Sequence, residues 1–155
     1  MTDFDRAFEK TLRFEGGGEL VDDPNDAGGP TRWGISQRAY PDLDIKNLTK
    51  EGAKEIYRKD YWLKIWPNDD DHETDPEDEI YLRMGWKLYD IAVNQGVPTA
   101  LKFKDKVNGI GSLYVLSELC ELQMKRYVEI TVNRPQNLTF LKGWCRRAFD
   151  KGNDL

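Results

Sequence analysis

The sequence predicts a single α+β domain that is mostly helical, with a small glycine-rich insert of loops and short strands after the first helix. Apolar residues recur at helical spacing over most of the chain, which favours helices. Residues 16–41 have no helical period, and six glycines fall within residues 16–34. The chain has 155 residues, without an internal repeat or a linker. That length is enough for one domain with its own hydrophobic core.

The first expected element is a helix that begins near residue 3, with Asp3 as its N-cap. Its apolar stripe consists of Phe4, Ala7, Phe8, Thr11, Leu12 and Phe14. The glycines after Glu15 end this helix. Glu15 therefore stands at a helix C-terminus, where the dipole and aromatic neighbours both disfavour a negative charge. "TRWGIS", residues 31–36, alternates weakly and predicts short strands.

Residues 47–66 read as a helix with Thr49 as its N-cap. The acidic run 67–79 lacks the glycine of a calcium loop and contains Pro76, so it is interpreted as a solvated loop rather than a cation site. Residues 79–96 are apolar on almost every side, which is typical of a central, buried helix. Gly96 ends that helix.

Three further helices are expected after Gly96. A short one runs from about residue 99 to 107, with Pro98 at its start. A long one runs from Ser112, its cap, to about residue 132, and Arg134-Pro135 breaks it. Asn137 then caps a final helix whose apolar face consists of Leu138, Leu141, Trp144, Cys145 and Ala148.

Charge and composition limit the function classes. From Thr99 onward ten basic residues face six acidic ones, whereas the first 98 residues carry 13 and 22. Only the back half thus favours an anionic partner, although two ordinary solvated faces would give the same counts. The single histidine, His72, excludes a His-pair metal site and argues against a Ser-His-Asp triad. Cys120 and Cys145 are interpreted as buried thiols rather than a disulfide.

The glycine-rich stretch displays carboxylates close to Glu15, namely Asp22, Asp23 and Asp26. It is no linker between domains, because only about thirteen residues precede it. A proton donor beside a second carboxylate is the chemistry of glycoside hydrolysis, in which the two acids need different environments. The pattern alone is weak, since an exposed glutamate at a helix end is the ordinary alternative.

The same stretch resembles the signature of the family 108 glycoside hydrolases, phage and bacterial N-acetylmuramidases of the lysozyme superfamily. The matching residues are Glu15-Gly16-Gly17, Asp23-Pro24-Asn25-Asp26, Gly28-Gly29, Thr31 and Gly34-Ile35-Ser36. "IYRKDYW", "LYDIAVNQG" and "KVNGIG" resemble later segments of the family. "RYVEITVNRPQNLTFLKGWCRRAF" resembles its C-terminal segment, which is described as peptidoglycan-binding and ends in Phe-x-x-Gly-Trp-x-x-Arg. The resemblance covers nearly the whole chain.

Two departures from the family pattern stand in this stretch. Ten residues separate Glu15 from Asp26, about two more than the pattern has, and Gly18 stands where the family often has an aromatic residue. Both leave the candidate catalytic residues in place.

The resemblance implies a lysozyme-like fold that cleaves the β-1,4 bond after N-acetylmuramic acid in peptidoglycan, without a metal or an organic cofactor. It implies Glu15 as the general acid, Asp26 as the second carboxylate and Thr31 as a residue that holds the water. Asp22 and Asp23 are rivals of Asp26. The candidate substrate-binding residues are Trp33, Tyr40 and Asn94, for which packing or helix capping is the alternative role.

Residues 1–155 are expected to form one muramidase domain, with residues 1–96 as its catalytic part and residues 97–155 as a helical part that binds peptidoglycan. The basic cluster Lys142, Arg146 and Arg147 is the expected docking surface for the glycan strands. A monomer without a nucleic-acid partner is expected. No membrane partner is expected either, because no apolar run approaches the length of a membrane helix.

The acidic N-terminus is no signal peptide. That fits a phage endolysin released from the host cytoplasm through a holin, or a muramidase carried in a virion. Two other functions stay open: a lytic transglycosylase that uses Glu15 alone, and a non-catalytic domain that binds peptidoglycan or serves a structural role.

Overall fold

The computed structural model describes residues 1–22, 28–69, 73–75 and 78–155, except for the side chains of residues 112 and 113. Its elements in chain order are α1 (Asp3–Phe14), β1 (Thr31–Arg32), β2 (Ile35–Ser36), η1 (Ile45–Asn47), α2 (Lys50–Tyr57), η2 (Arg58–Trp62), α3 (Leu63–Ile65), α4 (Glu79–Gln95), α5 (Val97–Val107), α6 (Ser112–Asn133), η4 (Pro135–Phe140) and α7 (Leu141–Phe149). The predicted α+β fold, mostly helical with a small insert after the first helix, is confirmed.

The N-cap of helix α1 lies one residue before Asp3, the predicted cap. Thr2 is the N-cap, because its hydroxyl accepts from the Asp5 amide and the Asp5 carboxylate accepts from the Thr2 amide. Asp3 lies inside the helix and is buried, and its carboxylate accepts a 2.8 Å bond from the Thr74 amide. A capping box satisfies two of the free amides at the start of a helix.

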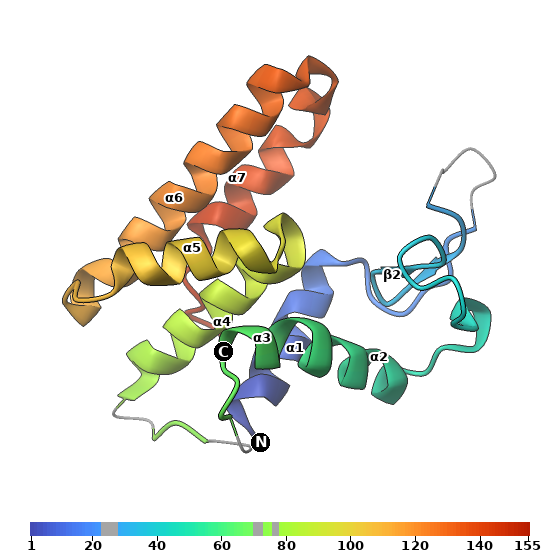
Figure 1. The fold of residues 1–155 in the computed structure, drawn as a ribbon, viewed down its shortest axis with the longest axis horizontal. Helices are drawn as coiled ribbons and strands as arrows, with labels where there is room; N and C mark the ends of the chain where they lie inside the picture. Colours follow the sequence, from blue (N-terminus) through green and yellow to red (C-terminus); the bar gives the residue numbers. More distant parts are fainter. Residues whose placement is uncertain (23–27, 70–72, 76–77) are drawn as a thin grey trace.

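The glycine-rich insert contains the short strands that "TRWGIS" predicts. Strands β1 and β2 pair in antiparallel register, with Thr31 opposite Ser36 and Arg32 opposite Ile35. Trp33 and Gly34 form the turn, with φ of 55° and 75°. The insert lies to one side of the C-terminal end of α1 (Figure 1).

The helix predicted over residues 47–66 begins as expected, since the Thr49 hydroxyl accepts from the Gly52 amide. It is not one continuous α-helix, however, because the π-helical segment η2 separates α2 from α3. A π-helical turn adds a residue to the helix without any compositional signal, so the apolar period alone could not locate it. Tyr57 and Tyr61 lie side by side across this junction, with ring centroids 5.5 Å apart.

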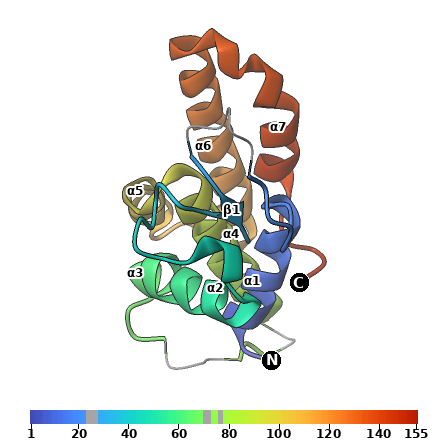
Figure 2. The ribbon, with the colours of Figure 1, turned by 90° about the vertical axis from the view of Figure 1, so that its right-hand side faces the viewer.

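Helix α4 is central, as its apolar sequence predicts. It packs against α1, α5 and α6, and Figure 2 shows α5 and α7 on opposite sides of it. Nine residues of α4 between Leu82 and Ala92 are buried, and these include the charged residues Lys87 and Asp90. A buried charge is costly unless it is paired, and both residues bond to the C-terminal part of the chain, as described below.

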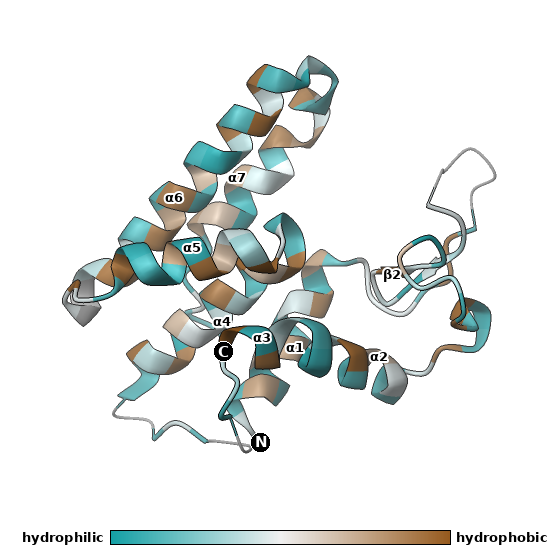
Figure 3. Cartoon of the chain, in the orientation of Figure 1, coloured by the Kyte–Doolittle hydropathy of each residue, from teal (hydrophilic) through white to brown (hydrophobic). Residues whose placement is uncertain are grey.

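Helices α6 and α7 form a hairpin that projects away from the rest of the fold (Figure 1). Hydrophilic and hydrophobic residues alternate along both helices (Figure 3), as is typical of helices with one packed face. The chain breaks near Pro135 as predicted, but α7 begins only at Leu141 and Asn137 lies within η4 instead of capping a helix. The cap of α6 is Gly111 rather than Ser112. Both cysteines are free thiols, as predicted, with Cys120 buried and Cys145 half-buried.

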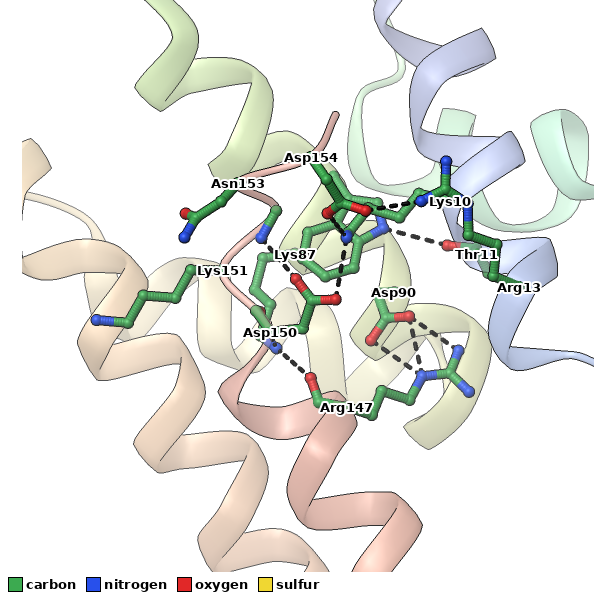
Figure 4. Close-up of polar contacts among 12 residues, drawn as sticks. Lys10, Thr11, Arg13, Lys87, Asp90, Arg147, Asp150, Lys151, Asn153 and Asp154 are labelled. Carbon is green, nitrogen blue, oxygen red and sulfur yellow. Dashed lines mark hydrogen bonds and ion pairs between the residues drawn. The ribbon is translucent and has the colours of Figure 1, made fainter.

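The C-terminal tail is held between α1 and α4 (Figure 4). Lys87 Nζ donates to the carbonyl oxygens of Arg147 and Ala148 at 2.8 Å and to that of Asp150 at 3.0 Å. Lys10 pairs with Asp150 at 3.0 Å. Burial lowers the pKa of Lys87. These bonds satisfy the free carbonyls at the end of α7 and thereby fix that end of the helix against the core.

Candidate active site

Glu15 follows α1 directly and faces the turn between the two strands. Gly16 and Gly17 have φ of 80° and 70°, so they reverse the chain at this point. A Cβ at Gly34 would lie 2.9 Å from Glu15 Cβ and 2.5 Å from Tyr57 Oη. Tyr57 Oη donates to the Trp33 carbonyl at 3.0 Å. The strand turn can therefore approach Glu15 only because residue 34 has no side chain.

Gly34→Ala is expected to destabilise the fold by about 2–4 kcal/mol, because it adds a positive-φ penalty to an overlap with Glu15 and Tyr57. The measurement is the free energy of unfolding in urea. Gly143→Ala is the matched control, since a Cβ there meets nothing within 4 Å. This control is expected to be neutral or stabilising, and equal losses in both variants would contradict the close approach at Gly34.

Arg147, from α7, binds Glu15. Its Nη1 donates to Glu15 Oε1 at 2.7 Å, and its Nε donates to the two carboxylate oxygens of Asp90 at 2.9 and 3.1 Å. Asp90 is 0 % exposed and the Arg147 side chain 6 %, whereas the Glu15 side chain is 22 % exposed. Figure 4 shows the guanidinium against Asp90 on α4. Burial alone would lower the pKa of Arg147, but the carboxylates of Asp90 and Glu15 raise it above its usual value.

This ion pair bears on two expectations. The sequence places Glu15 at a helix end among aromatic neighbours, and the structure adds the guanidinium of Arg147 at 2.7 Å, which the sequence did not indicate. Arg147 also cannot belong to an exposed docking cluster with Lys142 and Arg146, because it is buried and already paired. Arg146 and Lys142 are exposed, as expected.

Tyr57 and Tyr61 lie close enough to Glu15 for its charge to act on them, and Tyr40 lies beside Tyr61. Burial raises the pKa of Tyr57, and the charge of Glu15 raises it further. Burial also raises the pKa of Tyr61 and of Tyr40. Tyr40 Oη donates to Asp60 Oδ2 at 2.8 Å. All three are therefore hydroxyl donors throughout the neutral range. Tyr57 and Tyr61 lie 42 and 46 positions after Glu15 in the chain, so no local sequence signal indicates their proximity to it.

Trp33 has a clear packing role. Its ring lies against Gly18, where an added Cβ would be 2.3 Å from Trp33 Cη2, and its Nε1 donates to the Leu48 carbonyl at 3.0 Å. Gly18 stands where the family often has an aromatic residue, and the ring of Trp33 fills that space from the neighbouring turn.

Two other candidates, Thr31 and Asn94, make hydrogen bonds to residues other than Glu15. Thr31 lies in β1, and its hydroxyl donates to the Gly29 carbonyl at 3.2 Å. Asn94 is one turn beyond Asp90 on α4, on the same face, and its Oδ1 accepts from Tyr127 Oη at 2.5 Å. No contact joins either residue to Glu15 within the described part of the chain.

Two of the candidate second carboxylates, Asp23 and Asp26, lie outside the described residues. Their rival Asp22 is described. Its Oδ2 lies 3.1 Å from Lys46 Nζ, and both side chains are exposed. Asp22 therefore faces a surface cation rather than Glu15.

The described residues contain no cluster of three or more His, Cys, Asp or Glu side chains that could hold a metal ion. A search of the same residues for a helix of sufficient length and apolarity to cross a membrane found none. In the acidic run, Asp69 accepts from Trp62 Nε1 at 2.6 Å and Glu73 pairs with the N-terminal amine at 2.7 Å. These two carboxylates thus have partners within the protein.

Comparison with known proteins relates this geometry to a family. The family model described as Glycosyl hydrolase 108 matches residues 8–96, more than half of the chain, and the match includes Glu15, both strands and α4. No curated protein matches the chain. A solved structure, "Structure of Brucella abortus SagA", superimposes with a TM-score of 0.67 at 26% sequence identity, covering 96% of this chain and 91% of that chain. The chain belongs to glycosyl hydrolase family 108, and by that membership it is a glycoside hydrolase.

Proposed function

We propose that the protein is an N-acetylmuramidase that hydrolyses the β-1,4 bond between N-acetylmuramic acid and N-acetylglucosamine in peptidoglycan. Membership of the family supplies the reaction type. The observation that carries the proposal is the placement of Glu15, which is half-buried between Arg147 and the Trp33–Gly34 turn. A single carboxyl group held at a partly desolvated position suits the general acid of glycoside hydrolysis.

The contact with Arg147 determines which oxygen of Glu15 carries the proton. Arg147 donates to Oε1, and a guanidinium accepts no hydrogen bond, so protonation falls on Oε2. Among the described residues Oε2 has no hydrogen bond or ion pair. In the protonated acid, Oε1 is then the carbonyl that accepts from Arg147, and Oε2–H is directed to the glycosidic oxygen as its bond to the sugar breaks.

Asp26 is the proposed second carboxylate, which orients the attacking water or stabilises the oxocarbenium-like transition state, with Thr31 beside the water. The pairing of Asp22 with Lys46 at the surface favours Asp26 over Asp22. Asp23 precedes Pro24, which suits a role in shaping the turn. Trp33, Tyr40 and Asn94 are proposed to contact the glycan.

Residues 1–96 are the proposed catalytic part, and residues 97–155 a helical part that contacts peptidoglycan. The division is not strict, because Arg147 from α7 binds the proposed acid. The proposed biological setting is a monomeric phage endolysin that reaches the cell wall through a holin, or a virion-associated enzyme. Peptidoglycan strands are the proposed partner.

The mass of the products tests the reaction. On purified cell walls, a muramidase produces N-acetylmuramic acid at new reducing ends. A lytic transglycosylase that uses Glu15 alone would produce anhydro ends that are one water lighter, and a binding domain would release nothing. We expect reducing ends by mass spectrometry, and either of the other outcomes would contradict the proposal.

A further inference from the structure

A groove between α5 and α6 concentrates positive charge, although the chain has a net charge of −5. It has a volume of about 350 Å³ and is lined by Lys102 and Lys106 from α5 and by Lys125 and Arg126 from α6. Glu129 is the carboxylate that also lines it among the described residues. A concave surface of one sign focuses the electrostatic field and raises the local concentration of ligands of opposite charge.

The positive charge of this basic groove is only partly neutralised. Lys125 pairs with Glu121 at 2.6 Å, and Arg126 pairs with Glu129 at 3.1 Å. Lys102 and Lys106, one turn apart on α5, have no ion-pair partner in the described part of the chain. Like charges one helical turn apart repel each other and destabilise a helix. An anion bound beside Lys102 and Lys106 would relieve this repulsion.

Two hydrogen bonds connect the surroundings of the basic groove to the C-terminal end of α4. Arg126 lines the groove, and its neighbour Tyr127 binds Asn94 on the adjacent side of α6. Thr99, at the end of the groove, donates to the carbonyl of Gln95 on α4 at 2.9 Å. A strand bound along the Asn94 side of α4 would thus pass beside the groove.

We propose that the basic groove binds the free carboxylates of the peptide stems carried by the glycan strand that is cleaved at Glu15. The inference rests on the proposed function. Between its cationic side chains the groove is lined by the apolar residues Pro98, Phe103 and Leu122. That combination matches a peptide in which carboxylates alternate with small apolar side chains, and it matches a sugar-phosphate polymer less well. Lysine ammonium groups are flexible point charges, which suit carboxylates at variable spacing.

The test compares two substrates with Lys102→Glu/Lys106→Glu. One substrate is glycan strands that retain their peptide stems, and the other is the same strands after an amidase has removed the stems. We expect the variant to raise KM about fivefold on the stem-bearing strands, since each exposed ion pair contributes modestly. KM on the stripped strands and kcat on both are expected to stay at the parent values.

The matched control is Lys59→Glu/Lys64→Glu, which makes the same change of charge on exposed residues of η2 and α3 and is expected to leave both KM values unchanged. In 0.5 M salt the KM difference between the groove variant and the parent is expected to shrink, because exposed charges are screened.

Three results would overturn the inference. These are an unchanged KM on stem-bearing strands, an equal rise on both substrates, and a rise that disappears when only the phosphate polymers are extracted from the walls. If the parent protein cuts neither substrate, the proposed function itself fails and the inference fails with it. Cutting by the parent with no difference between the substrates overturns the inference alone.

Discussion

Replacing Glu15 with glutamine is expected to lower the rate of peptidoglycan cleavage at least about a hundredfold, because positioned general acids contribute roughly 10²–10⁴-fold. Glutamine keeps the size of the side chain, and its carbonyl oxygen can still accept from Arg147 Nη1. What it loses is the proton on the second oxygen. The loss should therefore appear in kcat, measured on purified walls, with KM close to the parent value.

The control is Glu19→Gln, an exposed residue four positions further along the same loop. It removes the same charge near the site and is expected to keep full activity. The melting temperature of Glu15→Gln should stay within a few degrees of the parent, because Asp90 still neutralises Arg147. A Glu15→Gln protein that cleaves walls at the parent rate would exclude Glu15 as the acid.

Replacing Arg147 with methionine is expected to destabilise the fold by about 3–5 kcal/mol, the usual cost of removing one partner of a buried ion pair. Asp90 is 0 % exposed, so the change leaves a carboxylate without its counter-ion inside the core. Glu15 loses a partner as well, but its side chain is 22 % exposed, so water can solvate the carboxylate and the loss costs less there. The free energy of unfolding in urea measures the effect.

The double variant Asp90→Asn/Arg147→Met separates the ion pair from general packing. Removing both charges avoids an uncompensated carboxylate, and asparagine can still accept from Gln123 Nε2, which now donates to Asp90 at 3.3 Å. The double variant is expected to regain at least half of the lost stability. Its kcat should stay below that of the parent, since Glu15 is no longer oriented. A double variant no more stable than Arg147→Met would contradict this account of the pair.

Much of the fold follows from local signals. The helices were predicted where apolar residues recur at helical spacing, and the strands where "TRWGIS" alternates. The departures come from features without such a signal. The π-helical turn at residues 58–62, which buries Trp62, and the 3-10 segment at residues 135–140, which follows Pro135 and buries no residue, have no signature in the apolar period.

The candidate site divides in the same way. Glu15 stands out from sequence, because glycines follow it at a helix end. Its partner Arg147 lies 132 positions away, and charge counts treat every arginine as a surface residue. One signal did exist, because Arg147 is three residues after Trp144 and next to Ala148, both on the predicted buried face of the last helix. A basic residue on an apolar face calls for a buried partner.

Cleavage of purified peptidoglycan in oxygen-18-labelled water tests the central claim most directly, with the parent and Glu15→Gln run side by side. If Glu15 is the acid of a muramidase, the parent should place one label on each new reducing end, and that end should be N-acetylmuramic acid. Glu15→Gln should give at least a hundredfold less labelled product in the same time. Label on N-acetylglucosamine ends, unlabelled anhydro ends, or equal labelling by the two proteins would contradict the account.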